Sequence, residues 1–333
     1  MRIGLSYDLK TDVTKNHKVD DALEEYDSPE TVKIIAGALE KKGHRIVHLG
    51  GGAQFIDNIR REKVDFVFNI SEGRGNYRSR EAQVPAVLEM LDIPYTGSDP
   101  LTLAVCLDKT LTKKFVSLAG IPTPKWLIVN DVKELIKKDW KVFHFPVIIK
   151  PAYEGSSKGI RLTSLAENIT QTEAEVKRIL KDYSQSVMVE EFIDGEEVTM
   201  GVIGNAPPKL VGTMRIIPKQ KPKHFVYSVE VKRDYVNLVE YESPAKFPKP
   251  VLQKLEEYAL NAFKTLGCRD VSRVDFRVGT DGTPYFIEIN PLPGLGTYSD
   301  LIIMATKLGW THEEIIGAVL DAAIERYPKC VGV

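Results

Sequence analysis

The sequence predicts an α/β fold whose N-terminal part is a parallel, Rossmann-like sheet and whose C-terminal part is α+β. Apolar strands alternate with apolar-periodic helices through the first hundred residues, which is typical of a parallel sheet covered by helices. From residue 145 onward, strands follow one another with short loops between them, which favours antiparallel pairing. A chain of 333 residues is long enough for two or three domains.

The N-terminal elements are marked by strand runs, a helix cap and glycines. Ser28 and Pro29 form the cap and first turn of a helix that runs to Lys42. Another helix is expected around AVLEML (86–91), after a polar loop. Gly50–Gly52 lack the GxGxxG spacing of a dinucleotide site, so we interpret them as a tight turn. The three expected strands are RIGLSY (2–7), RIVHLG (45–50) and DFVFNI (65–70).

The rest of the chain contains four expected helices among many strands. One long helix is expected from about Leu101 to Leu118, and IPTPKWLIV (121–129) leads from it into a strand. The other helices are expected at about 166–182, at 249–266 and at 313–327. The expected strands are FPVIIKP (145–151), VMVEEFI (187–193), EVTMGVIG (197–204), KLVGTMRII (209–217), FVYSVEVK (225–232), SRVDFRV (272–278) and PYFIEIN (284–290).

Charge and composition argue against several classes of protein. The 45 basic and 46 acidic residues nearly cancel, so no nucleic-acid partner is expected. No apolar run approaches the ~18 residues of a membrane span, and the N-terminus lacks an apolar signal core. We therefore expect a cytoplasmic protein without a membrane partner. Cys106, Cys268 and Cys330 lie far apart, so neither a disulfide framework nor a zinc site is expected.

The hairpin around the turn GTDGT is expected to gather polar side chains on one face. With a four-residue loop at 279–282, Val278 pairs with Thr283, so Arg273 falls opposite Glu288 and Asp275 lies diagonal to it. The polar face is then expected to hold Arg273, Asp275, Phe286, Glu288 and Asn290, and the core face Val274, Phe276, Val278, Tyr285, Ile287 and Ile289.

This polar face predicts a magnesium site. Carboxylate and amide oxygens from Asp275, Glu288 and Asn290 are hard ligands of the kind that Mg²⁺ prefers, with water and phosphate oxygens completing its shell. Arg273 beside them suits a developing anion. The alternative is an exposed ladder of salt bridges, which would require neither Asn290 nor the Pro/Gly loop after it.

The run VIIKPAYEGSSKGI (147–160) predicts a phosphate clamp. A strand delivers Lys150, and the small residues of EGSSKG allow backbone N–H groups to fold over a polyphosphate. It is not a P-loop, because GxxxxGK[ST] is missing. The alternative is an ordinary flexible surface loop.

The run VMVEEFIDGEEVTM (187–200) is a candidate nucleotide-binding segment. Phe192 and Ile193 are placed to sandwich a purine, and Glu197 to bind ribose hydroxyls. The alternative is a solvated acidic hairpin. Lys109 and Lys232 add positive charge, although each is more often a plain surface lysine.

Taken together, four runs resemble the D-alanine:D-alanine ligases of the ATP-grasp superfamily in order and spacing. They are IPYTGSDPLTLAVCLDKTLTKKF (93–115), FPVIIKPAYEGSSKGI (145–160), VEEFIDGEEVT (189–199) and SRVDFRVGTDGTPYFIEINPLPGLGTYSDL (272–301). The resemblance implies an ATP-grasp fold of three domains. These would be an N-terminal substrate domain at 1–98, a central ATP-grasp subdomain with the phosphate loop at 99–186, and a C-terminal subdomain with the metal and substrate sites at 187–333.

The resemblance also implies a reaction, in which ATP phosphorylates a substrate carboxylate and the amine of a second amino-acid-type substrate attacks the acyl phosphate. The implied ATP contacts are Lys109, Lys150, the loop 154–159 with Glu154, Gly155, Ser156 and Ser157, then Glu190, Phe192, Ile193, Glu197, and Lys232 near the γ-phosphate. The implied Mg²⁺ ligands are Asp275, Glu288 and Asn290. Arg273 and the Gly294 N–H would stabilise the tetrahedral oxyanion, and Ser299 would bind the carboxylate of the amine donor. Ser156 and Lys232 are candidate catalytic residues as well, and a homodimer is an expectation from the family only.

The sequence departs from that family in the loop after the third strand. Dipeptide ligases carry HGxxGEDG there, whereas this chain has NISEGRGNYRSREAQ (69–83). We expect at least one of Arg74, Arg78 and Arg80 to point into the cleft and to pair with a carboxylate or phosphate, so that the activated substrate carries an extra anionic group or is longer than D-alanine. The alternative is that all three are solvated charges or brace a domain interface.

Two further substrate contacts follow less directly. Glu24 or Glu25 would hold the amine of the first amino acid, and Tyr235 would replace a family tyrosine, because Arg233 follows Lys232. The sequence therefore indicates a D-alanine:D-alanine-ligase-like enzyme. The alternatives are a ligase for a different carboxylate plus an amino acid and a nucleotide-binding regulator without turnover.

Overall fold

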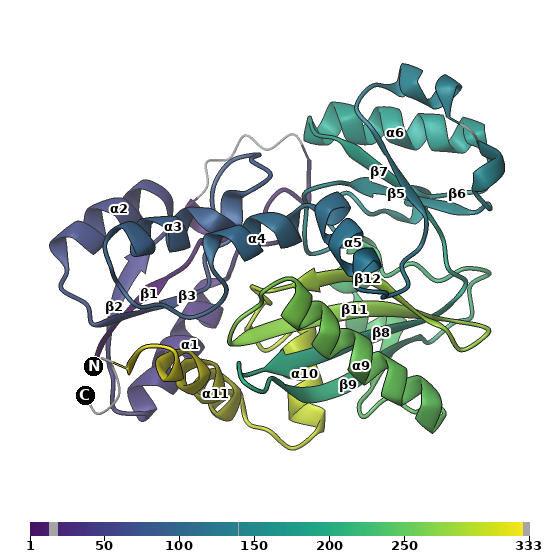
Figure 1. Ribbon diagram of the computed structural model, residues 1–333. Helices are drawn as coiled ribbons and strands as arrows, with labels where there is room; N and C mark the ends of the chain where they lie inside the picture. The colour runs from purple at the N-terminus through teal and green to yellow at the C-terminus, as the bar shows by residue number, and fades with distance from the viewer. Residues whose placement is uncertain (13–18, 139, 329–333) are drawn as a thin grey trace.

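The structure is a computed structural model that describes residues 1–12, 19–138 and 140–328, and it contains three sheets (Figure 1). The first sheet has the order β2-β1-β3 and is parallel, as predicted, with strands β1 (Arg2–Ser6), β2 (Arg45–Gly50) and β3 (Phe66–Asn69). Helices α1 (Pro29–Lys41), α2 (Gly52–Arg61) and α3 (Gln83–Met90) cover it. Ser28 caps α1 by accepting the Thr31 N–H, and α2, which begins inside the glycine run, was not predicted.

The second sheet is antiparallel, with the order β4-β7-β5-β6. Its strands are β4 (Trp126–Val129), β5 (Val147–Pro151), β6 (Leu165–Ala166) and β7 (Val187–Glu191). Helix α6 (Ile169–Tyr183) lies along one face (Figure 1), where Val176 and Ile179 pack against strand residues such as Val147 and Val189. The other face is left for the site described below.

The third sheet is also antiparallel, with the order β10-β9-β8-β11-β12. Its strands are β8 (Gly195–Ile203), β9 (Lys209–Pro218), β10 (Val239–Glu242), β11 (Val271–Gly279) and β12 (Pro284–Asn290). Helix α9 (Lys249–Thr265) covers one face, with Leu255, Ala259 and Phe263 in the core.

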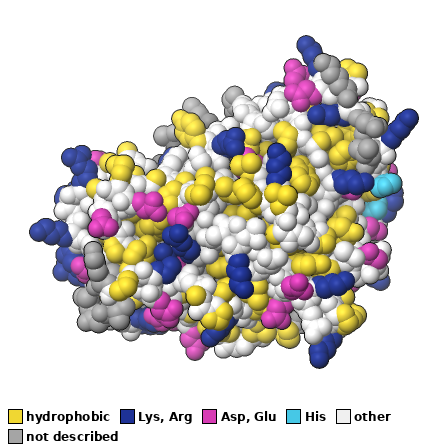
Figure 2. Space-filling view, viewed as in Figure 1, with side chains coloured by type: hydrophobic (Ala, Val, Ile, Leu, Met, Phe, Trp, Pro, Cys, Tyr) yellow, Lys and Arg dark blue, Asp and Glu magenta, His cyan; other side chains and the backbone are white. Residues whose placement is uncertain are grey.

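The C-terminal helices return to the N-terminal sheet. α10 (Asp300–Lys307) packs on β8 and β9, and α11 (His312–Glu325) packs beside α1, next to the N-terminal sheet (Figure 1). One apolar cluster therefore joins Ile35 and Leu39 of α1 to Ile316 and Leu320 of α11. In the described ranges, no helix is both long and apolar enough to cross a membrane. Charged side chains of both signs are scattered over the face shown in Figure 2.

Two predicted elements are wrong in detail. The single helix expected from Leu101 to Leu118 is two helices, α4 (Pro100–Leu107) and α5 (Lys109–Leu118), because the Asp108 carboxylate caps α5 by accepting the N–H groups of Thr110 and Leu111. The strand expected at 225–232 is absent. There, Ser228 caps the short helix α7 (Val229–Arg233), and α8 (Tyr235–Leu238) follows.

The β11–β12 hairpin has the predicted polar face but a different register. Val278 pairs with Pro284 rather than with Thr283, and together with a second shift further along the hairpin this places Asp275 opposite Glu288 and Arg273 opposite Asn290. The register then shifts between Asp275 and Phe276, which leaves Ile287 as the extra residue of a β-bulge.

Because of the bulge, the residues of β12 that precede it, Tyr285 and Phe286, lie on the opposite faces of the sheet from those expected. Phe286 is fully buried in the core beside Phe276, so its expected place on the polar face is wrong. Ile287 lines the site cavity and Tyr285 is only partly buried, so neither belongs to the core as expected. A period-two pattern places residues correctly only as far as the next bulge.

This register predicts unequal costs for two neighbouring truncations. Phe286→Ala is expected to lower the free energy of unfolding by about 3–5 kcal/mol, because it leaves a cavity in a fully buried site. Tyr285→Ala should cost clearly less. Urea unfolding measures the free energy of unfolding of both variants. A larger loss for Tyr285→Ala than for Phe286→Ala would indicate the register without the bulge.

The strand order of the second sheet is relevant to the predicted domain boundary between residues 186 and 187. A boundary between residues 186 and 187 would separate β7 from β4 and β5, the strands that flank it. We therefore propose that the second boundary lies between β7 and β8, near residue 192. The domain limit at residue 98 stays a prediction.

Candidate active site

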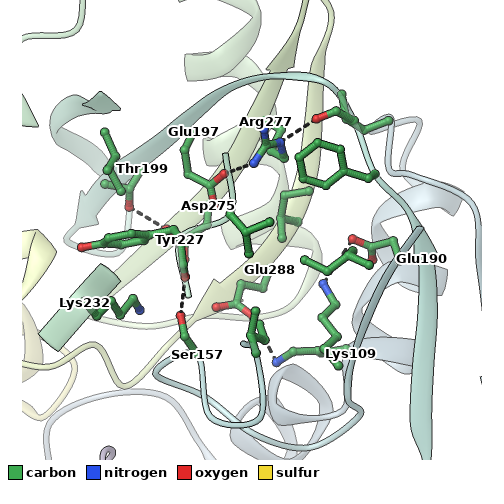
Figure 3. A pocket seen from close by; sticks show the side chains of 18 of the residues that line it. Lys109, Ser157, Glu190, Glu197, Thr199, Tyr227, Lys232, Asp275, Arg277 and Glu288 are labelled. Atoms are coloured by element: carbon green, nitrogen blue, oxygen red, sulfur yellow. Dashed lines mark hydrogen bonds and ion pairs between the residues drawn. The ribbon is translucent and has the colours of Figure 1, made fainter. Parts of the chain in front are cut away.

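A deep cavity lies between the second and third sheets, with side chains from both pointing into it (Figure 3). Most of the predicted nucleotide and metal residues line it together with the predicted catalytic residue Arg273, although they come from segments that are far apart in sequence. They are Lys109, Lys150, Glu154, Ser157, Glu190, Phe192, Ile193, Glu197, Lys232, Arg273, Asp275 and Glu288.

The polar face of the hairpin forms one wall of this cavity. Arg273 Nη2 lies 2.8 Å from Asp275 Oδ2, and Lys109 Nζ lies 3.0 Å from Glu288 Oε2. Thr199 donates to Asp275 Oδ1 at 2.6 Å, and Asn290 donates to Asp275 Oδ2 at 3.2 Å. The four predicted side chains are therefore brought together, with two carboxylates held beside two cations.

These cations control the charge of Glu288. Burial alone would raise the pKa of the Glu288 carboxyl, but Lys109, Lys150 and Arg273 outweigh burial and lower that pKa below its usual range. The Arg273 pKa is raised, because Asp275, Asp300 and Glu288 outweigh the opposing effect of burial. Glu288 is therefore ionised at neutral pH.

Behind this wall, two buried lysines share one buried glutamate. Lys150 Nζ lies 3.1 Å from Glu190 Oε1, and Lys113 Nζ lies 2.8 Å from Glu190 Oε2. Burial lowers the pKa of Lys113 to about 8, against the opposing effect of Glu190. Lys113 was not predicted, although its position one helical turn after Lys109 on α5 placed it on the same face.

An aromatic and guanidinium stack forms the other end of the cavity. The guanidinium carbon of Arg277 lies 4.4 Å from the centre of the Phe192 ring. Arg277 also pairs with Glu197 and donates to the Ile193 carbonyl at 2.7 Å. Burial is the main cause that raises the Glu197 pKa. Arg277 was missed because alternation alone does not show that it faces Glu197 across β8 and β11.

The predicted phosphate loop is folded against the N-terminal part of the chain. Ser156 and Ser157 have φ values of 49° and 60°, a left-handed conformation that non-glycine residues seldom adopt. Gly155 N donates to Glu25 at 2.5 Å, and Ser157 Oγ donates to the Tyr227 carbonyl at 2.9 Å. These contacts hold the loop over the junction between this cavity and a second one.

The second cavity adjoins the first and lies toward the N-terminal sheet. It is lined by the predicted residues Glu24, Gly155, Ser156, Asn290, Gly294 and Ser299. A β-carbon on Gly294 would lie 2.8 Å from Ser299 Oγ, so a larger residue here would displace that hydroxyl. Four residues line both cavities: Lys109, Glu154, Arg273 and Glu288.

The prediction for the arginine loop is wrong, because none of the three arginines lines either cavity. Arg74 pairs with Asp8 at 2.8 Å, and Arg78 pairs with Asp108 at 3.0 Å. Arg80 is only 2% exposed and joins Glu25 at 2.7 Å to Glu154 at 3.1 Å. Arg78 and Arg80 therefore brace the N-terminal part against the rest of the chain, whereas the Arg74 ion pair lies within the N-terminal part.

Two other expected substrate contacts need correction. Tyr235 lines neither cavity, because its ring packs on Tyr241 with 5.9 Å between centres. Tyr227, which was not predicted as a site residue, lines the first cavity, and Lys232 Nζ lies over its ring. Glu24 lines the second cavity, but Arg233 holds its carboxylate at 2.7 Å.

The carboxylate and amide oxygens on the polar face of the hairpin are suitable ligands for Mg²⁺. Asp275 and Glu288 face each other across the hairpin with an amide beside them, and Mg²⁺ is usually held by one or two carboxylates together with substrate phosphates. In the part of the chain that the structure describes, no three Asp, Glu, His or Cys side chains form a complete metal cage. The face therefore suits a metal that arrives with a phosphate group.

Comparison with known proteins gives consistent matches. The sequence profile of the family described as "D-ala D-ala ligase C-terminus" matches residues 115–321. A D-alanine–D-alanine ligase of Aquifex aeolicus is 33% identical over 88% of this chain and 94% of that protein. The uncharacterised protein y4sG of Sinorhizobium fredii is 31% identical over 88% and 87%. A crystal structure of the D-alanine–D-alanine ligase of Bacillus anthracis complexed with ATP superposes with a TM-score of 0.77 over 99% of both chains, at 23% identity.

Proposed function

Because the chain belongs to the D-alanine–D-alanine ligase family, we propose that it is an ATP-dependent ligase that joins the carboxylate of one amino-acid-type substrate to the amine of another. The fold of the family, ATP-grasp, is the fold described above. One observation carries the proposal. The cavity between the two antiparallel sheets and the cavity near Ser299 share Lys109, Glu154, Arg273 and Glu288, so a phosphoryl donor in one meets a carboxylate in the other.

The first cavity supplies the groups that ATP needs. Phe192 and Ile193 offer an apolar wall for the base, and Glu197 offers a carboxylate for ribose hydroxyls. Lys150 and Lys109 line this cavity, and Lys109 also lines the second one, so the phosphates would lie near Lys109, with Lys232 entering from α7. Their positive charges stabilise the transferring phosphoryl group, because positioning and electrostatics supply most of the catalysis in such transfers.

Asp275, Glu288 and Asn290 would hold Mg²⁺. The metal would neutralise phosphate charge during the transfer. Arg273 and Lys109 fix the two carboxylates in place, and the low pKa of Glu288 keeps it ionised as a ligand.

The second cavity supplies the substrate groups. Arg273 and Gly294 line this cavity, and the Arg273 guanidinium and the Gly294 N–H would stabilise the oxyanion that forms when the amine attacks the activated carboxyl. Ser299 lies beside Gly294 and would bind the carboxylate of the amine donor. Ser156 lines the same cavity from the loop above it.

A regulator without turnover is the weaker alternative. Such a protein would not need Asp275, Glu288, Lys109 and Arg273 at the junction of two cavities. The cytoplasmic location and the homodimer stay predictions.

The proposal is tested by measuring ADP release from ATP and Mg²⁺ with single amino acids and pairs of them, in both configurations. The expected result is release that depends on an amino acid, with an amide product detected by mass spectrometry. ATP binding without any amino-acid-dependent release would favour the regulator.

A separate prediction concerns the phosphate clamp. Lys150→Ala should weaken ATP binding by about 10- to 100-fold, because it removes a charged hydrogen-bond donor, worth about 1.5–3 kcal/mol, from a buried site. Calorimetry measures the affinity. Lys114→Ala is the control, since Lys114 lies exposed on α5, and equal affinities in the two variants would remove Lys150 from the site.

A further inference from the structure

Three carboxylates form a wall of the second cavity that the proposed reaction does not use. Asp27 lies just before α1, Glu72 follows the carboxyl end of β3, and Glu81 lies in the short 3₁₀ helix Arg80–Ala82. All three line the cavity that also contains Gly294 and Ser299. We call Asp27, Glu72 and Glu81 the acidic wall.

The other carboxylates around this cavity already have cationic partners. Glu25 pairs with Arg80 and Lys158, and Glu154 pairs with the same two residues. Glu24 pairs with Arg233, and Glu288 with Lys109. The acidic wall differs, because none of its side chains has an ion pair or a hydrogen bond in the described ranges. The cavity therefore contains three carboxyl groups that no described residue binds by an ion pair or a hydrogen bond, although Arg80 lies near enough to lower the pKa of Glu72 and Glu81.

Among the three residues of the acidic wall, Glu81 is the clearest case of a buried carboxylate without a partner. It is only 8% exposed, yet its side chain lines the cavity and has no partner among the described residues. An unpaired carboxylate at such burial is costly, since charged groups are normally buried with a partner. Burial raises the pKa of Glu81 to about 7, and burial raises the pKa of Asp27 to about 7.

The pKa of Glu72 shows that the carboxyl groups of the acidic wall influence one another. Burial and the nearby carboxylates of Glu81, Glu25 and Asp27 raise its pKa well above the usual range, against the opposing effect of Arg80. A bound cation would relieve both the burial cost and the mutual repulsion.

The geometry favours an organic cation over a metal ion. In the described part of the chain these carboxylates are not grouped closely enough to form a metal cage. An ammonium or guanidinium group donates several hydrogen bonds in different directions, which suits carboxylates spread along a wall. A single α-ammonium group would balance only one of the three.

We propose that one amino-acid substrate of this enzyme is basic, with a second cationic nitrogen that binds the acidic wall. This inference rests on the proposed ligase function and adds the substrate class. It also replaces the expected anionic substrate, because the loop that follows β3 presents Glu72 and Glu81 to the cavity and turns its arginines away.

The test compares basic amino acids with neutral ones of matched length. ADP release is measured with lysine and ornithine against norleucine and norvaline, in both configurations, each alone and paired with D-alanine. Wild type should show a KM for a basic amino acid at least tenfold lower than for its neutral match. Glu81→Gln and Glu72→Gln should each raise that KM about tenfold or more, with a much smaller change in kcat.

Two controls separate binding from folding. Glu257→Gln removes an exposed carboxylate on α9 and should change neither KM nor kcat. Glu81→Gln should unfold in urea no earlier than wild type, because it removes an unpaired buried charge rather than an ion pair.

Comparable KM values for basic and neutral substrates, or a Glu81→Gln variant with an unchanged preference, would overturn the inference, and so would D-alanine serving alone at both positions. If no amino acid releases ADP, the ligase function itself fails, and calorimetric binding of lysine against norleucine then decides the inference. Tighter binding of lysine supports it, and equal or absent binding overturns it.

Discussion

Replacing Glu288 by glutamine is expected to reduce amino-acid-dependent ADP release by about 100-fold or more. The amide cannot balance a divalent ion or the charge of Lys109, which lies 3.0 Å from the carboxylate. Metal ions supply several kcal/mol of transition-state stabilisation, and about 2.7 kcal/mol corresponds to a hundredfold change in rate. The measurement is kcat at saturating ATP and Mg²⁺.

Glutamine has nearly the same shape, so the fold should persist, and far-UV circular dichroism checks it. Glu240→Gln is the matched control, because Glu240 is an exposed carboxylate on β10 of the same sheet. Turnover of Glu288→Gln within a few-fold of wild type would show that the hairpin face does not hold the metal.

Arg80→Met is expected to lower the free energy of unfolding by about 3–5 kcal/mol, because it breaks a buried ion network and leaves Glu25 and Glu154 to share the single cation of Lys158. The Arg80 side chain is 3% exposed and contacts Glu25 and Glu154, whereas the Arg78 side chain is 58% exposed. Urea unfolding measures the loss.

Arg78→Met should cost less than about 1 kcal/mol, since exposed ion pairs contribute little. Similar small losses for the two variants would show that Arg80 does not brace the domains. An Arg80→Met variant that stays stable while its KM for the substrate rises would show that Arg80 contacts the substrate, as first expected.

Patterns within one segment predicted most of the fold. The apolar runs of β1, β2 and β3 and the cap at Ser28 marked the parallel sheet, because each signal is local. The polar face of the hairpin was also predicted, since alternation fixes which residues share a face. The bulge at Ile287 was not, because no local signal marks it, and it moved Phe286 into the core.

Partners from distant segments explain what the sequence could not predict. Arg74, Arg78 and Arg80 were expected in the cleft because their loop follows a parallel strand. Their partners Asp8, Asp108 and Glu25 come from elsewhere in the chain, and only the fold brings them together. For the same reason, the acidic residues of that loop became cavity residues without any signal in the sequence.

The central claim is that this protein activates a carboxylate at the junction of its two cavities and joins it to an amine. An isotope-transfer experiment tests this claim most directly, with ATP, Mg²⁺ and a mixture of amino acids labelled with ¹⁸O in their carboxyl groups. Activation as an acyl phosphate predicts inorganic phosphate that carries one ¹⁸O atom from the carboxyl group, together with the amide formed from the two amino acids. Unlabelled phosphate, or ADP release without an amide product, would contradict the account.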